Sequence, residues 1–114
     1  MTAQWKEITS ITQWEKAYQQ STEKPFVILK HSTACPVSAN ALDEFESYIA
    51  KNPTSGVEFL LVKVIESRPV SNQIAEDLKV KHASPQVIWV KNKENGWNTS
   101  HYSITVAHMT AVLS

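Results

Sequence analysis

A short run of aromatic and β-branched residues, Phe26-Val-Ile-Leu-Lys30, limits the folds open to this chain. The run is too short for an independent helix and shows no polar alternation, so it predicts a strand buried on both faces. Such a strand needs helices above and below its sheet. The preceding residues 11–20 supply one, because their apolar side chains recur at helical spacing behind a capping Ser10 or Thr12.

A second helix follows the strand and begins beside the only cysteine of the chain, Cys35. Apolar residues recur at spacings of three and four from Val37 to Ile49, and Pro36 falls in the first turn, where its missing N–H costs nothing. The inward stripe starts at Val37, so we expect Cys35 to precede it and to lie at the mouth of the fold. An Asn-Pro pair and a glycine within residues 52–56 predict the end of this helix.

The rest of the sequence continues the alternation of strands and helices. The predicted elements are a strand at 57–64, a helix opening at Pro69, a strand at 87–90, a strand at 98–103 and a helix capped by Thr105. Residues 91–97 predict a polar turn between the last two strands, and the Asn95-Gly96 pair within them is the strongest hairpin signal. In the last helix we expect Val106, Met109 and Val112 or Leu113 to face inward. A short strand near residues 5–8 is also compatible with the pattern.

The predicted order is α-β-α-β-α-β-β-α. Strands separated by helices need parallel crossovers, and a terminal hairpin adds an antiparallel edge. We therefore predict a single α/β domain over residues 1–114, with a central mixed sheet of four or five strands and helices on both faces. This order is typical of the thioredoxin fold.

Composition argues against several classes of function. Eleven basic residues balance eleven acidic ones, and no basic cluster with interleaved aromatic residues occurs, so we expect no nucleic-acid partner. The apolar stretches are too short to cross a bilayer, so we expect no membrane partner. No export signal is visible in the first residues. Together with the single cysteine, this predicts a free thiol in the reducing cytoplasm.

Cys35 is the candidate nucleophile because of its place at a helix N-terminus. Unpaired N–H groups and the helix dipole favour negative charge there, which stabilises a thiolate. The N–H groups of Val37 and Ser38 can point at the sulfur, and the Ser38 hydroxyl can add a hydrogen bond. The alternatives are that Cys35 is a small buried hydrophobic residue, and that Ser38 only satisfies backbone groups of the first turn.

Ser84-Pro85, just before the strand at 87–90, is a second candidate feature of the site. A proline at a strand entry is usually trans. The thioredoxin fold, however, has a cis-proline at this place, and the backbone of the preceding residue pairs with a substrate beside the cysteine. We therefore predict a cis Ser84–Pro85 bond close to Cys35.

Four other polar residues are weaker candidates. Lys30 and His31 end the first strand and would add positive potential near the cysteine, although residues at strand ends often face solvent. His82 lies three residues before Pro85, and Arg68 precedes a helix, so both are candidates for the mouth of the site, where Arg68 would meet an anionic small thiol. A solvated helix cap is the alternative for Arg68. The histidines share no ligand spacing, so we predict no metal site.

Four segments match one known pattern in order. They are Lys30-His-Ser-Thr-Ala-Cys-Pro-Val-Ser38, Val64–Glu76, His82–Gln86 and Trp97–His101. Together they resemble the monothiol bacilliredoxins of low-GC Gram-positive bacteria, and the resemblance covers most of the chain. It implies a thioredoxin fold and a cytoplasmic role in bacillithiol redox metabolism. Ala34 departs from the larger or charged residue expected in relatives.

The resemblance also implies roles for individual residues. Cys35 takes the place of the family's active cysteine, Ser38 the place where a dithiol protein keeps its resolving cysteine, and Pro85 that of the cis-proline. One cysteine cannot form an internal disulfide, so the reaction must end with an external thiol. The implied substrates are proteins in mixed disulfide with bacillithiol, and free bacillithiol with its reductase system regenerates Cys35. Bacillithiol is thus a co-substrate, and we expect no bound cofactor.

Two other functions stay open at this point. Monothiol glutaredoxin-like iron–sulfur carriers also use one cysteine on this fold, but their C-G-F-S motif has a glycine that lets the backbone approach the cluster. Pro36 blocks that approach and removes an N–H group. The other alternative is a non-catalytic thioredoxin-fold binding module in which Cys35 takes no part in chemistry.

Overall fold

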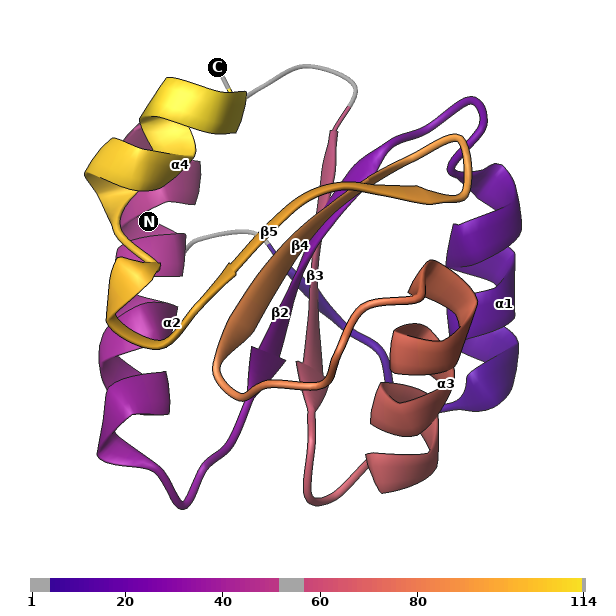
Figure 1. The fold of residues 1–114 in the computed structure, drawn as a ribbon, viewed down its shortest axis with the longest axis horizontal. Helices are drawn as coiled ribbons and strands as arrows, with labels where there is room; N and C mark the ends of the chain where they lie inside the picture. Colours follow the sequence, from indigo (N-terminus) through magenta and orange to yellow (C-terminus); the bar gives the residue numbers. More distant parts are fainter. Residues whose placement is uncertain (1–4, 52–56, 114) are drawn as a thin grey trace.

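The computed structural model describes residues 5–51 and 57–113, and its elements follow the predicted order (Figure 1). They are β1 Lys6–Glu7, α1 Ile11–Gln20, β2 Phe26–His31, α2 Pro36–Lys51, β3 Glu58–Lys63, α3 Arg68–Leu78, β4 Gln86–Lys91, β5 Glu94–Ser100, the 3-10 helix η1 His101–Ser103 and α4 Val106–Leu113. The predicted end of the second helix, at 52–56, lies outside the described residues.

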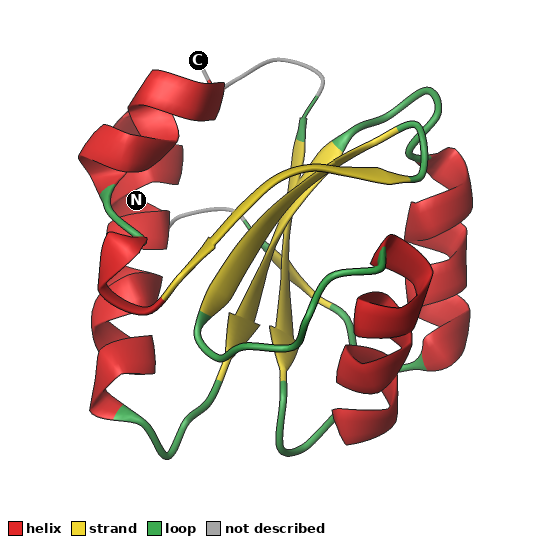
Figure 2. Ribbon diagram, viewed as in Figure 1, coloured by secondary structure: helices red, strands yellow, loops and turns green. Residues whose placement is uncertain are grey.

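The strands form one mixed sheet of five strands in the order β1-β3-β2-β4-β5. Strand β2 pairs with β3 in parallel and with β4 antiparallel. Helices α2 and α4 cover one face of the sheet, and α1 and α3 cover the other (Figures 1 and 2). The predicted α/β class and the helices on both faces are therefore confirmed.

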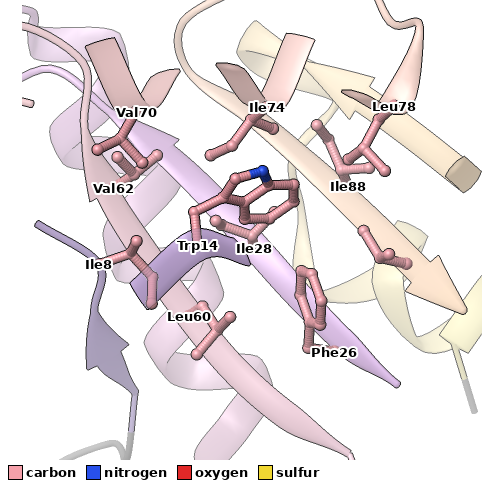
Figure 3. Packing of buried hydrophobic residues seen from close by; sticks show 11 residues of the cluster. Ile8, Trp14, Phe26, Ile28, Leu60, Val62, Val70, Ile74, Leu78 and Ile88 are labelled. Carbon is pink, nitrogen blue, oxygen red and sulfur yellow. The ribbon is translucent and has the colours of Figure 1, made fainter. Parts of the chain in front are cut away.

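Strand β2 is the central strand, and all six of its residues are buried. On the face covered by α1 and α3, Trp14 packs among Ile28 and Ile74 (Figure 3). Its indole N–H donates to Oδ2 of Asp77 at 2.8 Å, which ties α1 to α3.

The Oγ of Ser10 accepts from the N–H of Gln13 at 3.2 Å and caps α1 as predicted. Phe45 and Met109 help to fill the core on the opposite face.

The turn predicted at 91–97 contains the observed one, but Asn95-Gly96 does not form it. The turn lies at Asn92 and Lys93, whose φ values are 53° and 61°. Gly96 instead lies within β5, at a shift of the β4–β5 register. A Cβ there would come within 2.7 Å of Cδ1 of Trp89, so the glycine makes room for an indole ring across the ladder.

Three smaller predictions also need correction. The last strand ends at Ser100, and the residues predicted to extend it to 103 form η1 instead. In α4, Val112 is 41% exposed and not inward, while Met109 is fully buried. The side chain of Leu113 is outside the described part of the chain. The strand predicted at 57–64 has some polar alternation in its sequence, but β3 is buried at its four central residues because it lies between β1 and β2.

Candidate active site

The site forms at the carboxyl end of β2. The N–H of Val64 donates to the carbonyl of His31 at 2.9 Å, which fixes the neighbouring β3–α3 loop. The N–H of Cys35 then donates to the carbonyl of Ser32 at 3.3 Å, and α2 begins at the next residue, Pro36. The chain thus turns directly from a buried strand into a helix, with the cysteine at the turn.

Cys35 is partly exposed, as expected for a residue at the mouth of the fold. The pKa of its thiol lies below the ordinary value because the backbone N–H groups of Ser38 and Val37, and then the Ser38 hydroxyl, stabilise the thiolate. Partial desolvation opposes this shift but is outweighed by the largest of the hydrogen bonds. The direction and the donors agree with the sequence-based expectation.

Ser38 is fully buried, whereas Val37 is only half-buried. The inward stripe of α2 therefore starts at Ser38 and not at Val37, which corrects the prediction. The Ser38 Oγ accepts a hydrogen bond from the N–H of Ser32 at 3.2 Å. Ser38 is therefore a buried residue of the first turn of α2, and its side chain holds the loop that leads to Cys35.

The Ser84–Pro85 peptide bond is cis, as predicted. Residue Gln86 pairs with Lys30 in the antiparallel β2–β4 ladder. This pair is the last of the ladder, so the Ser84–Pro85 segment enters β4 at the same edge of the sheet where the chain leaves β2 toward Cys35. The carbonyl of Pro85 also accepts from the N–H of His101 at 3.0 Å, which joins η1 to this segment. The Ser84–Pro85 segment therefore lies beside the loop that carries Cys35.

Lys30 and His31 do not face solvent. They are 0% and 7% exposed, respectively, on opposite faces of β2. Burial lowers the pKa of Lys30 to about 8. Burial also lowers the pKa of His31, although a hydrogen bond to the backbone of Ser38 raises it in part. His31 therefore packs against the first turn of α2, and its Nδ1 has no hydrogen-bond partner within the described residues.

His82 and Arg68 both lie on the exposed side of the site. Burial lowers the pKa of His82, and the charges of Lys30 and Arg68 lower it further. The Nδ1 of His82 lies 3.2 Å from Nζ of Lys30. His82 therefore contacts the strand beneath it. Of these candidates, only Arg68 has no described contact with another site residue beyond its charge.

Two exposed apolar side chains flank the site and were missed from the sequence. Ile65 is 49% exposed and follows Val64, whereas Tyr102 is 74% exposed and follows His101. Each follows a residue whose backbone N–H donates to the site: Val64 donates to the carbonyl of His31, and His101 donates to the carbonyl of Pro85. For Ile65, the available signal was an apolar residue immediately beyond the predicted strand at 57–64, whereas Tyr102 fell inside the predicted strand at 98–103.

The described residues contain no group of three or more His, Cys, Asp and Glu side chains placed to hold a metal ion. Within the same part of the chain, none of the helices is long and apolar enough to cross a membrane.

A single cysteine at a helix N-terminus, with a cis-proline at the entry of β4 in this mixed sheet, is the arrangement of a thioredoxin-fold thiol–disulfide oxidoreductase. Solved structures support this class. One, described as a candidate oxidoreductase with a thioredoxin fold, has 32% identity and a TM-score of 0.83, over 95% of this chain and 92% of that one. The model of the family "Monothiol bacilliredoxin BrxC" matches residues 6–109. The chain belongs to the monothiol bacilliredoxin family.

More distant structures share the fold alone. Thioredoxin of Malassezia sympodialis (Mala s 13) has 21% identity and a TM-score of 0.76, over 97% of this chain and 89% of that one. Thioredoxin O2 from Arabidopsis thaliana has 18% identity and a TM-score of 0.75, over 97% and 92%. The predicted thioredoxin fold and family are both confirmed, and the protein is a thiol–disulfide oxidoreductase.

Proposed function

We propose that this protein removes bacillithiol from protein mixed disulfides, with Cys35 as the nucleophile. The observation that carries the proposal is the partly exposed Cys35 thiol, whose pKa is lowered by N–H and O–H donors of the first turn of α2. A lowered pKa raises the fraction of attacking thiolate near neutral pH. Membership of the bacilliredoxin family supports bacillithiol as the small thiol.

The reaction proceeds in two exchanges. The Cys35 thiolate attacks the bacillithiol sulfur of the mixed disulfide, a new S–S bond forms, and the client sulfur leaves as a thiolate that takes a proton from water. A second bacillithiol thiolate then attacks the bacillithiol sulfur on Cys35. This step releases oxidised bacillithiol disulfide and restores the Cys35 thiolate, so no electrons are gained or lost overall. A reductase system outside the chain returns the disulfide to free bacillithiol.

The neighbouring residues have supporting roles in this scheme. Ser38 and Val37 stabilise the thiolate, and Pro36 starts the helix without a competing N–H group. The Ser84 backbone pairs with the client polypeptide next to Pro85. His31, His82 and Arg68 line or support the mouth. We place the reaction in the reducing cytoplasm, and the scheme uses no bound cofactor.

A bacillithiolated client protein tests the proposal directly. Wild-type protein should lower the client mass by one bacillithiol and transiently raise its own mass by the same amount at Cys35, as followed by intact mass spectrometry. Cys35→Ser should do neither, because a serine hydroxyl neither attacks a disulfide nor leaves from one. Ser47→Ala, in the same helix but outside the site, is the matched control and should behave as wild type. Full activity of Cys35→Ser would refute the enzymatic role.

The purified wild-type protein also distinguishes the proposal from the two alternatives, an iron–sulfur carrier and a non-catalytic binding module. A brown protein as purified would favour an iron–sulfur carrier, whereas a colourless protein fits the proposal. If Cys35 failed to react with iodoacetamide, or had an ordinary or raised pKa, the result would favour a non-catalytic binding module.

A further inference from the structure

Lys30 is a fully buried cation in the central strand. Its side chain is 0% exposed, and its Nζ donates to the carbonyl of Ser71 at 3.1 Å. The second partner is Nδ1 of His82, at 3.2 Å. Neither partner is an anion, and no ion pair of Lys30 occurs among the described residues. Because an ammonium group buried without a counter-charge lowers the stability of a folded protein, packing alone does not account for this residue.

The contacts of Lys30 reach the segment that carries Ser84. His82 lies two residues before Ser84, and the Oγ of Ser71 lies 3.5 Å from the same His82 Nδ1. Gln86, which pairs with Lys30 in the ladder, donates from Nε2 to the carbonyl of Lys81 at 3.1 Å. These contacts tie the residues around Ser84 to β2 and α3, on the face of the sheet opposite to α2.

We infer that Lys30 is a positioning residue that, through His82, holds the Ser84 backbone in the orientation that pairs with the client polypeptide beside Cys35. Within the described part of the chain, no hydrogen bond uses the N–H or the carbonyl of Ser84, so both are available to a substrate. The last pair of the β2–β4 ladder joins Lys30 to Gln86, so Ser84 lies just before β4 at the sheet edge where the chain leaves β2 toward Cys35. The inference rests on the proposed function, because it requires a polypeptide substrate.

The chemistry of the contact defines a matched pair of variants. An ammonium group only donates, so Nδ1 of His82 accepts and the ring proton lies on Nε2. Asparagine at position 82 offers an amide oxygen close to the place of Nδ1 and does not titrate. His82→Asn therefore keeps the acceptor, whereas His82→Ala removes it. Since His82 is exposed, both variants are expected to fold.

Two reactions separate positioning from thiolate chemistry. A small aromatic disulfide, 5,5′-dithiobis(2-nitrobenzoate), reports the reactivity of Cys35 alone. A peptide in mixed disulfide with bacillithiol also requires pairing with the Ser84 backbone. For Lys30→Met and His82→Ala we expect a loss of roughly tenfold in kcat/KM with the peptide, mainly through KM, because a backbone-orienting hydrogen bond is lost. Their rates with the aromatic disulfide should stay within about twofold of wild type.

The controls decide between positioning and other roles. His82→Asn should recover most of the peptide activity, and Lys16→Met, an exposed lysine of α1, should match wild type. Equal losses in both reactions, or a His82→Asn variant no better than His82→Ala, would overturn the inference. A wild-type protein that accepts a peptide in mixed disulfide with cysteine, but not with bacillithiol, would refute the proposed function instead. The cysteine-modified peptide would then serve to test the role of Lys30.

Discussion

The backbone N–H of Ser32 donates to Oγ of Ser38 at 3.2 Å, so the hydroxyl proton of Ser38 is free to point at the sulfur of Cys35. A serine hydroxyl can accept one hydrogen bond while it donates another. Ser38 therefore links the loop before Cys35 to the charge on Cys35. Its hydroxyl is one of the groups that lower the pKa of Cys35.

Alkylation of Cys35 should titrate below the ordinary pKa of a cysteine, about 8.5. The reason is that the N–H groups of Ser38 and Val37 stabilise the charged form, and only this form reacts. The rate of iodoacetamide labelling, measured by mass from pH 5 to 10, gives the midpoint. The same protein unfolded in urea is the control and should titrate near the ordinary value. A folded midpoint at or above that of the unfolded chain would contradict the assignment of Cys35.

Ser38→Ala should raise the pKa of Cys35 and slow its alkylation at pH 7 by roughly two- to tenfold, because one donor to the thiolate is lost. At a pH well above the new midpoint the rate should equal or exceed that of wild type, since a more basic thiolate is intrinsically more nucleophilic. Ser47→Ala is the control on the same helix. A complete loss of bacillithiol removal by Ser38→Ala would mean that Ser38 does more than adjust the thiolate.

Local patterns predicted the fold well because burial sets the periodicity of each element. Helix α1, strand β2 and helix α3 follow directly from their apolar spacing. The hairpin turn was predicted too long, and Asn95-Gly96 was placed in it, because Asn-Gly has two physical uses. It suits a two-residue turn, but the glycine at position 96 is required for the close approach of Trp89, and the turn uses Asn92 and Lys93.

Gly96→Ala should destabilise the protein by roughly 1–3 kcal/mol, because the added methyl group would lie within 2.7 Å of Cδ1 of Trp89 and force the ring to move. Urea unfolding followed by tryptophan fluorescence measures the free energy of unfolding. Glu94→Ala, an exposed change in the same strand, is the control and should stay within about 0.5 kcal/mol of wild type. No loss in Gly96→Ala would show that the hairpin tolerates a side chain there.

The candidate site was predictable only where it is local in sequence. Cys35, Ser38 and the cis-proline follow from their places at the start of a helix and of a strand. The contact between Lys30 and His82 joins residues 52 positions apart and depends on the β2–β4 register, which no local pattern specifies. A lysine at the end of an apolar strand is more often solvated, so its burial could not be foreseen.

Lys30→Met should change the pH dependence of stability. Burial lowers the pKa of Lys30 to about 8 in the folded protein, against about 10.4 for an ordinary lysine. Below pH 8 both the folded and the unfolded chain hold the proton, so the cost of the buried charge is fully present. Methionine of similar length avoids that cost, and we expect Lys30→Met to equal or exceed wild-type stability at pH 7.

Between about pH 8 and 10.4 the unfolded wild-type chain keeps a proton that the folded protein has lost, so wild-type stability rises with pH relative to the variant. Across this window the free energy of unfolding of the wild type should rise, relative to that of Lys30→Met, by on the order of 1–3 kcal/mol. Urea unfolding at pH 7, 8, 9 and 10 measures it, with Lys16→Met as the exposed control, for which we expect no comparable trend. A difference between Lys30→Met and wild type that does not vary with pH would show that Lys30 titrates as an ordinary lysine. A variant that loses peptide activity while its stability at pH 7 is unchanged or higher would indicate that the buried cation is kept for function and not for folding.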